Sequence, residues 1–150
     1  MLLAKNVLFP IKRGAGYEDT FQLACSLAKG AKGKIHAIYV IEVKLELPLD
    51  AEIGEETSRG EDALAYIEHL AKEEKCSLEA EILQARQAGP AIVQEAVNIP
   101  ADLIVLGINH RHNVTGFQVG ETTNYILENS RCPVLLWRNR VTGNSSSPRG

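Results

Sequence analysis

The chain has 150 residues, 45% of them hydrophobic and 23% charged, which is typical of one folded α/β domain and unlike a disordered chain. Its formal net charge of −3 provides no basic surface that would neutralise many phosphates, so we expect no nucleic-acid binding. No apolar run reaches the roughly 18 residues of a membrane-spanning helix, so we expect a soluble chain without direct membrane insertion.

The first third of the chain predicts a βαβ unit. Asn6 to Ile11 and Lys34 to Ile41 are short runs rich in β-branched and aromatic residues, as in strands. The segment between them has apolar residues at three- and four-residue spacing, which indicates a helix. These residues are Phe21, Ala24, Cys25 and Ala28.

A polar segment from Glu42 to Gly60 separates this unit from a second predicted helix. One face of that helix is apolar and should pack on a sheet, whereas the opposite face is charged. The apolar residues are Leu64, Ile67, Leu70 and Ala71, and the charged ones are Glu61, Glu68, Lys72 and Glu73. Leu78 to Ala85 then predicts a third strand.

The second half of the chain repeats the alternation of helix and strand. Gly89-Pro90 predicts the start of a helix, because proline in the first turn costs no hydrogen bond. The expected buried side of this helix is Ile92, Val93, Ala96 and Val97. Asp102 to Leu106 is almost wholly apolar, as in a central parallel strand. A loop from Gly107, a helix from about Gly120 to Asn129, and a strand from Pro133 to Trp137 complete the pattern.

This order predicts an α/β fold, an open five-stranded, doubly wound parallel sheet with helices on both faces. One domain should span residues 1–138. Residues 139–150 have no apolar periodicity and are rich in Ser, Gly and Asn, so we expect a disordered tail. Ligands of such sheets bind beyond the carboxyl ends of the strands, where the winding direction reverses.

Three stretches of the chain resemble the universal stress protein family: "NVLFPI", "ADLIVLG" and "GETTNYILENSRCPVLLW". The resemblance implies an adenine nucleotide alpha hydrolase-like fold and a cytoplasmic homodimer with a role in stress responses. Many members bind ATP through the motif G-x2-G-x9-G-[ST]. Here Gly107 and Gly120 occupy the first and third glycine positions, His110 replaces the second glycine, and Glu121 replaces the serine or threonine.

A further departure follows the first strand, where ATP-binding members carry an aspartate and this chain has Lys12. A lysine side chain has donors only and cannot accept a hydrogen bond from ribose. The "LPLD" and "FQVGETTNYIL" stretches are similar to stress-protein domains appended to amino-acid-type transporters. That similarity implies a regulatory module with a membrane transporter as partner.

Two interpretations of the glycine-framed loop follow from the sequence. In the first, backbone N–H groups near Gly107 and at the helix start hold a phosphate of ATP or another adenine nucleotide, and Thr122 or Thr123 supplies a hydroxyl. In the second, Glu121 is an ordinary first-turn acid and the protein is a ligand-free interaction module. The candidate ligand-binding residues are Ile11, Lys12, Arg13, Val40, Gly107, His110, Arg111, Gly120, Glu121, Thr122 and Thr123.

The chain contains no motif that predicts catalysis or a metal site. GxSxG, HExxH and Walker sequences are missing, and no residue can be assigned as the base for ATP hydrolysis, so we expect no enzymatic activity. His110 and His112 have no third ligand at suitable spacing, so we expect no metal. A flavin or dinucleotide site is a weaker alternative, because no GxGxxG follows the first strand.

Three cysteines, Cys25, Cys76 and Cys132, form an odd set without a CxxC pair. This pattern argues against a disulfide scaffold and against structural zinc, and it fits a reducing cytoplasm. The apolar surroundings of Cys132 favour packing over reactivity.

The last predicted strand is apolar and would be an aggregation liability as an uncovered sheet edge. The family resemblance implies that it pairs across a two-fold dimer axis. The dimer candidates are Val134, Leu135, Leu136 and Trp137. Alternatively, Trp137 covers the core of its own domain.

Overall fold

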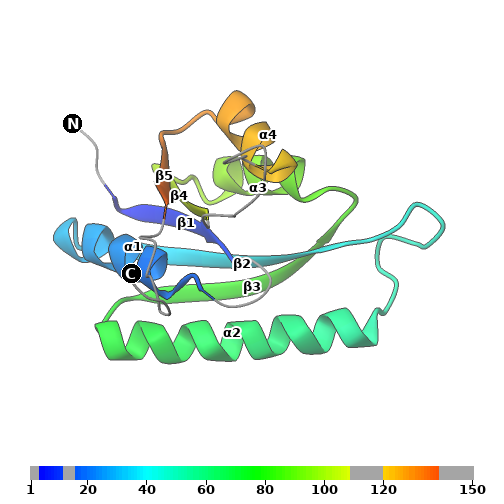
Figure 1. Cartoon of the computed structure of the whole chain (residues 1–150), viewed down its shortest axis with the longest axis horizontal. Helices are drawn as coiled ribbons and strands as arrows, with labels where there is room; N and C mark the ends of the chain where they lie inside the picture. The colour runs from blue at the N-terminus through cyan, green and yellow to red at the C-terminus, as the bar shows by residue number, and fades with distance from the viewer. Residues whose placement is uncertain (1–3, 12–15, 109–119, 139–150) are drawn as a thin grey trace, which may run out of the picture.

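The computed structural model describes residues 4–11, 16–108 and 120–138 and confirms the predicted architecture (Figure 1). Five parallel strands form one sheet in the order β3-β2-β1-β4-β5. The strands are β1 (Asn6–Pro10), β2 (Lys34–Glu42), β3 (Leu78–Ala85), β4 (Leu103–Ile108) and β5 (Val134–Arg138). The helices are α1 (Glu18–Gly30), α2 (Gly54–Glu74), α3 (Ala88–Asn98) and α4 (Glu121–Asn129). The order of the strands reverses direction between β1 and β4, which is the switch point of a doubly wound sheet.

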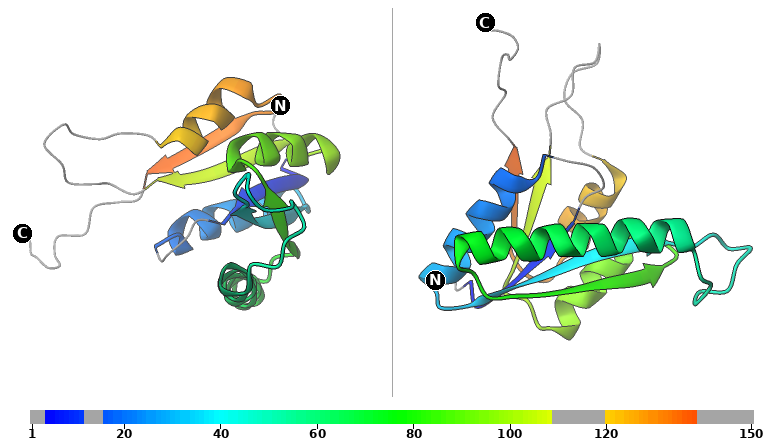
Figure 2. Two further views of the ribbon diagram at one scale, coloured as in Figure 1. Left: turned by 90° about the vertical axis from the view of Figure 1, so that its right-hand side faces the viewer. Right: turned by 90° about the horizontal axis from the view of Figure 1, so that it is seen from below.

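The sheet lies between two helical layers, with α1 and α2 on one face and α3 and α4 on the other (Figures 1 and 2). Side chains of β4 alternate between the two layers, as the period of a strand requires. Leu103 and Val105 pack with α1 and α2, whereas Ile104 and Leu106 pack with α3 and α4. The four apolar residues predicted on α1 are fully buried.

Helix α2 begins at Gly54, so the prediction of a polar, non-helical segment as far as Gly60 was wrong. Gly60 lies inside the helix, because α2 approaches the sheet closely there. A Cβ on Gly60 would lie 2.9 Å from Ile82 and 3.0 Å from Tyr39. Ion pairs of Arg59 with two glutamates of the first turn support this end of the helix. The predicted apolar and charged faces of α2 are otherwise confirmed.

Helix α3 begins at Ala88, close to the predicted start, but its buried side differs from the prediction at Val97. Val97 is 44% exposed, whereas Ile92 and Ala96, four residues apart, are buried on the sheet. The helix turns its other flank to α4, where a Cβ on Gly89 would lie 2.9 Å from the Tyr125 side chain. Val97 belongs to neither contact and therefore faces solvent.

Strand β4 continues to Ile108, two residues beyond its predicted end. Gly107 and Ile108 pair with Trp137 and Arg138 of β5, so Gly107 is part of the sheet and not of the following loop. β5 forms an edge of the sheet, and Trp137 is 40% exposed, so it does not close the core of this chain. No described helix combines the length and apolar character needed to cross a bilayer.

Candidate functional site

A cavity of about 400 Å³ opens where the carboxyl ends of β1, β2 and β4 meet the first turns of α3 and α4. This is the switch point of the sheet, and the volume lies within the range of small-molecule sites. The cavity is lined by Pro10, Ile11, Ile38, Val40, Glu42, Glu56, Ala88, Ile92, Leu106, Gly107, Thr122, Thr123 and Ile126.

The structure brings together five of the residues proposed from the sequence as ligand contacts. Ile11, Val40, Gly107, Thr122 and Thr123 all line the cavity, although they come from four separate parts of the chain. Gly120 and Glu121 begin α4 nearby but are exposed and do not line it. Lys12, Arg13, His110, Arg111 and His112 lie outside the described residues.

Sequence reasoning missed the apolar floor of the cavity and two carboxylates. Ile38, Ile92 and Ile126 are at most 3% exposed and line the cavity. Glu42 directly follows the apolar run of β2, so the rule about the carboxyl ends of strands would have identified it. Glu56 was missed because the start of α2 was predicted several residues too late.

The two helix N-termini at the cavity differ in their capping. The first backbone N–H of α3, that of Ala88, donates a hydrogen bond to Glu42 Oε2 at 2.8 Å, so a carboxylate already occupies that position. Helix α4 has Gly120 as its N-cap, with no hydrogen bond from a capping side chain. The first N–H groups of a helix have no intrahelical acceptor and attract anions, so the start of α4 is a candidate position for an anionic group of a ligand.

The backbone of Gly107 borders the cavity, but a Cβ at this position would point away from the cavity, toward the helical layer of α1 and α2. A Cβ at Gly107 would lie 2.6 Å from Thr20 Oγ1 and 3.1 Å from Thr20 Cγ2, and Thr20 is fully buried on α1. The cavity floor belongs to the α3 and α4 layer instead. Close packing of β4 against α1 is therefore sufficient reason for a glycine at this position.

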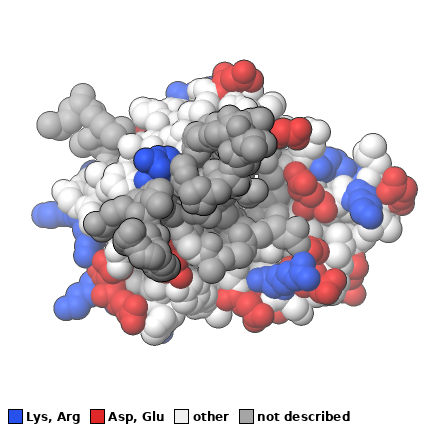
Figure 3. All heavy atoms as spheres, in the orientation of Figure 1, with Lys and Arg blue, Asp and Glu red and all other residues white. Residues whose placement is uncertain are grey.

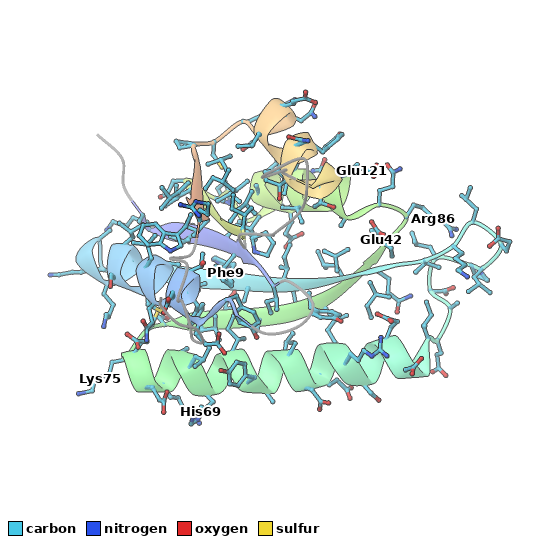
Figure 4. All side chains as sticks on the ribbon, viewed as in Figure 1. Phe9, Glu42, His69, Lys75, Arg86 and Glu121 are labelled. Carbon is cyan, nitrogen blue, oxygen red and sulfur yellow. The ribbon has the colours of Figure 1, made fainter. Side chains whose placement is uncertain are left out.

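The charge among the described lining residues is negative. Glu42 and Glu56 are the only ionisable side chains among the described residues that line the cavity. Glu56 forms an ion pair with Arg59 at 3.1 Å. Figure 4 shows Glu42 and Glu121 at the same end of the sheet, with Arg86 near Glu42. Arg86 donates to the carbonyl groups of Lys44 and Leu47 at 2.7 and 2.9 Å, so its guanidinium holds the loop after β2.

On the side of the molecule shown in Figure 3, the acidic and basic side chains of the described residues are interspersed. Within the described part of the chain, no three His, Cys, Asp or Glu side chains are grouped to hold a metal ion. The site can therefore offer an apolar floor, threonine hydroxyls, helix N–H groups and carboxylate acceptors to a small ligand.

Comparison with known proteins matches residues 4–138 to the model of the universal stress protein family. A universal stress protein of Methanocaldococcus jannaschii is 27% identical over 140 residues, covering 89% of this chain and 82% of that protein. The structure of a universal stress protein from Archaeoglobus fulgidus in complex with dAMP has a TM-score of 0.73 at 14% identity, covering 90% of this chain and 98% of the other. An Arabidopsis thaliana family member with AMP bound has a TM-score of 0.67 at 16% identity, covering 91% and 93%.

Proposed function

The chain belongs to the universal stress protein family, and on that premise we propose that it is a regulatory domain that binds an adenine nucleotide in the cavity between β1 and β4. The observation that carries the proposal is the convergence of Ile11, Val40, Gly107, Thr122 and Thr123 on one cavity at the switch point. Relatives of the same fold hold dAMP and AMP, which supports this ligand class. The role is proposed as binding without catalysis.

The lining fits a nucleotide with few phosphates. The apolar floor suits the faces of a purine ring, and Glu42 or Glu56 supplies the ribose acceptor that Lys12 cannot supply. The hydroxyl groups of Thr122 and Thr123 and the N–H groups of the first turn of α4 would hold one phosphate. Each added phosphate increases repulsion from the two carboxylates, so AMP or a cyclic monophosphate should bind more tightly than ATP.

Calorimetric titration with AMP, cyclic AMP, ADP and ATP tests the proposal, using a variant that fills the cavity. Val40→Phe places a ring in the cavity and should weaken AMP binding at least about tenfold, equivalent to 1.4 kcal/mol. Val97→Phe makes the same change on the exposed side of α3 and should leave binding unchanged. The absence of heat and of any melting shift with all four nucleotides at millimolar concentration would refute nucleotide binding.

A second candidate function, an interaction module, is favoured by the exposed edge of β5. Val134, Leu135 and Leu136 are half-buried and Trp137 is 40% exposed, which is the kind of apolar edge that a partner strand covers. We propose that Val134 to Trp137 form a homodimer contact. Sedimentation equilibrium should give a dimer mass for the chain and a monomer mass for Trp137→Glu; a monomeric parent chain would contradict this proposal.

The transporter partner and the cytoplasmic location are proposed from the sequence resemblance alone. Binding of this chain to the cytoplasmic face of a transporter would be measured with the two purified proteins.

AMP that remains with the purified chain, detected by mass spectrometry after denaturation, would count against a purely ligand-free module.

A further inference from the structure

The segment between β2 and α2 exposes three leucines close together in the chain. Leu45, Leu47 and Leu49 are 84%, 41% and 46% exposed, and every residue of the leucine loop, residues 44–50, is exposed. Figures 1 and 2 show the segment extending beyond the start of α2 and the end of β3. One exposed leucine is ordinary, whereas three within five residues form the kind of apolar surface that is typical of an interaction site.

The three leucines are not needed to fold the segment on which they lie. Its ends are fixed by other apolar residues, because Val43 is buried and Ile53 packs against the core of α1 and α2. Between them the backbone forms two successive turns, residues 44–47 and 48–51, each closed by a backbone hydrogen bond of 3.0 Å. Turns favour Gly, Pro, Asn, Asp and Ser, yet the second residue of both turns is a leucine. Local folding therefore gives no reason for leucine at these positions.

Side chains from β3 and its end hold the leucine loop in one conformation. Arg86 donates from Nη1 to the carbonyl groups of Lys44 and Leu47 at 2.7 and 2.9 Å. Gln84 donates from Nε2 to two further carbonyl groups of the segment, both at 2.9 Å. Because these bonds fix the backbone before a partner arrives, association loses less conformational entropy than it would with a flexible loop.

The charge around the leucine loop is negative. Residues 42–59 together with Arg86 contain six carboxylates and three basic side chains, and one of the three, Arg59, is paired with two of those carboxylates. An anionic membrane surface or a nucleic acid would be repelled by this excess of carboxylates. A protein surface with an apolar groove edged by lysine and arginine side chains would complement both the leucines and the charge.

We propose that the leucine loop is a docking surface for a second protein, which presents an apolar groove edged by basic side chains. Leu45, the most exposed of the three leucines, enters the groove, and the neighbouring carboxylates of Glu46 and Asp50 interact with its basic edge. This contact uses neither the edge of β5 nor a bound nucleotide, so it stands independently of the two functions proposed above.

The first part of the test identifies the partner with a photoreactive residue. In the full chain, p-benzoylphenylalanine replaces Leu45, and in a control chain it replaces Leu127, an exposed leucine of α4. Irradiation in cells that make the protein naturally should join the chain to a different protein from position 45 and not from position 127. The absence of an adduct, or an adduct only within one chain, between two copies of it or with lipid, overturns the proposal.

The second part measures the affinity of the purified chain for the purified partner. Leu45→Gln should weaken binding at least about tenfold, whereas Leu127→Gln makes the same change elsewhere and should leave the affinity unchanged. Glu46→Lys and added salt should both weaken binding, because they act on the attraction between the carboxylates and the basic edge. Equal affinity of Leu45→Gln and the parent chain, or an affinity that neither salt nor Glu46→Lys lowers, shows that the proposal is wrong.

Discussion

Replacement of Gly107 by alanine tests whether packing, and not only ligand approach, requires the first glycine of the motif. The new Cβ would lie 2.6 Å from Thr20 Oγ1, closer than real Cβ contacts, and Thr20 has no exposed surface through which to move. Overpacking of this kind costs about 1–3 kcal/mol. For a domain of this size each kcal/mol lowers the melting temperature by about 2–4 °C, so we expect a decrease of roughly 2–12 °C.

The control is Gly120→Ala, the other glycine that matches the motif. A Cβ at Gly120 would meet no atom of the described residues within 4 Å, and its φ of −72° suits alanine, so stability should stay within about 0.5 kcal/mol. Urea unfolding followed by circular dichroism measures both variants. Thr20→Ala removes Oγ1 and Cγ2 and leaves only the Cβ at 3.1 Å, so Gly107→Ala should cost less in that background. Equal stability of the two glycine variants, or the same penalty with Ala at position 20, would show that the packing argument is wrong.

Two further predictions concern hydrogen bonding and ionisation. Glu42→Ala removes the acceptor of the Ala88 N–H and should lower the unfolding free energy by about 1–2 kcal/mol, whereas Glu42→Gln keeps an acceptor and should lose less. Urea unfolding measures both variants, with Glu46→Ala at an exposed position as the control. Equal effects of Glu42→Ala and Glu46→Ala would contradict a capping role for Glu42. Burial, followed by the charges of Tyr66 and Glu18, raises the pKa of Tyr17 to about 12. Because the unfolded chain releases this proton near pH 10 and the folded chain retains it, stability should fall between about pH 10 and 12, and less steeply in Tyr17→Phe. Absorbance titration of tyrosinate should lose its highest-pH component in that variant, and an unchanged titration would show that Tyr17 ionises normally.

The apolar pattern of the chain predicted most of the fold, because the spacing of residues along one segment is a local property. The periodicity of 3.6 identified the buried residues of α1, and the apolar run before Gly107 identified a central strand. The errors occurred where packing against another element decided the outcome. Gly60 looked like the end of a loop but lies in α2, where it fits against Ile82, and Val97 fitted the helical stripe but meets no neighbouring layer.

The sequence by itself determined the order of strands and helices, the family, and five residues that line the cavity. Only the tertiary structure decided that Glu42 and Glu56 share that cavity and that Gly107 is required by Thr20. Each of these contacts joins a residue of a strand to a residue of a helix, and it exists only because α1 and α2 pack on the sheet. Residue spacing encodes which face of an element is apolar, whereas contacts between elements depend on how the layers pack together.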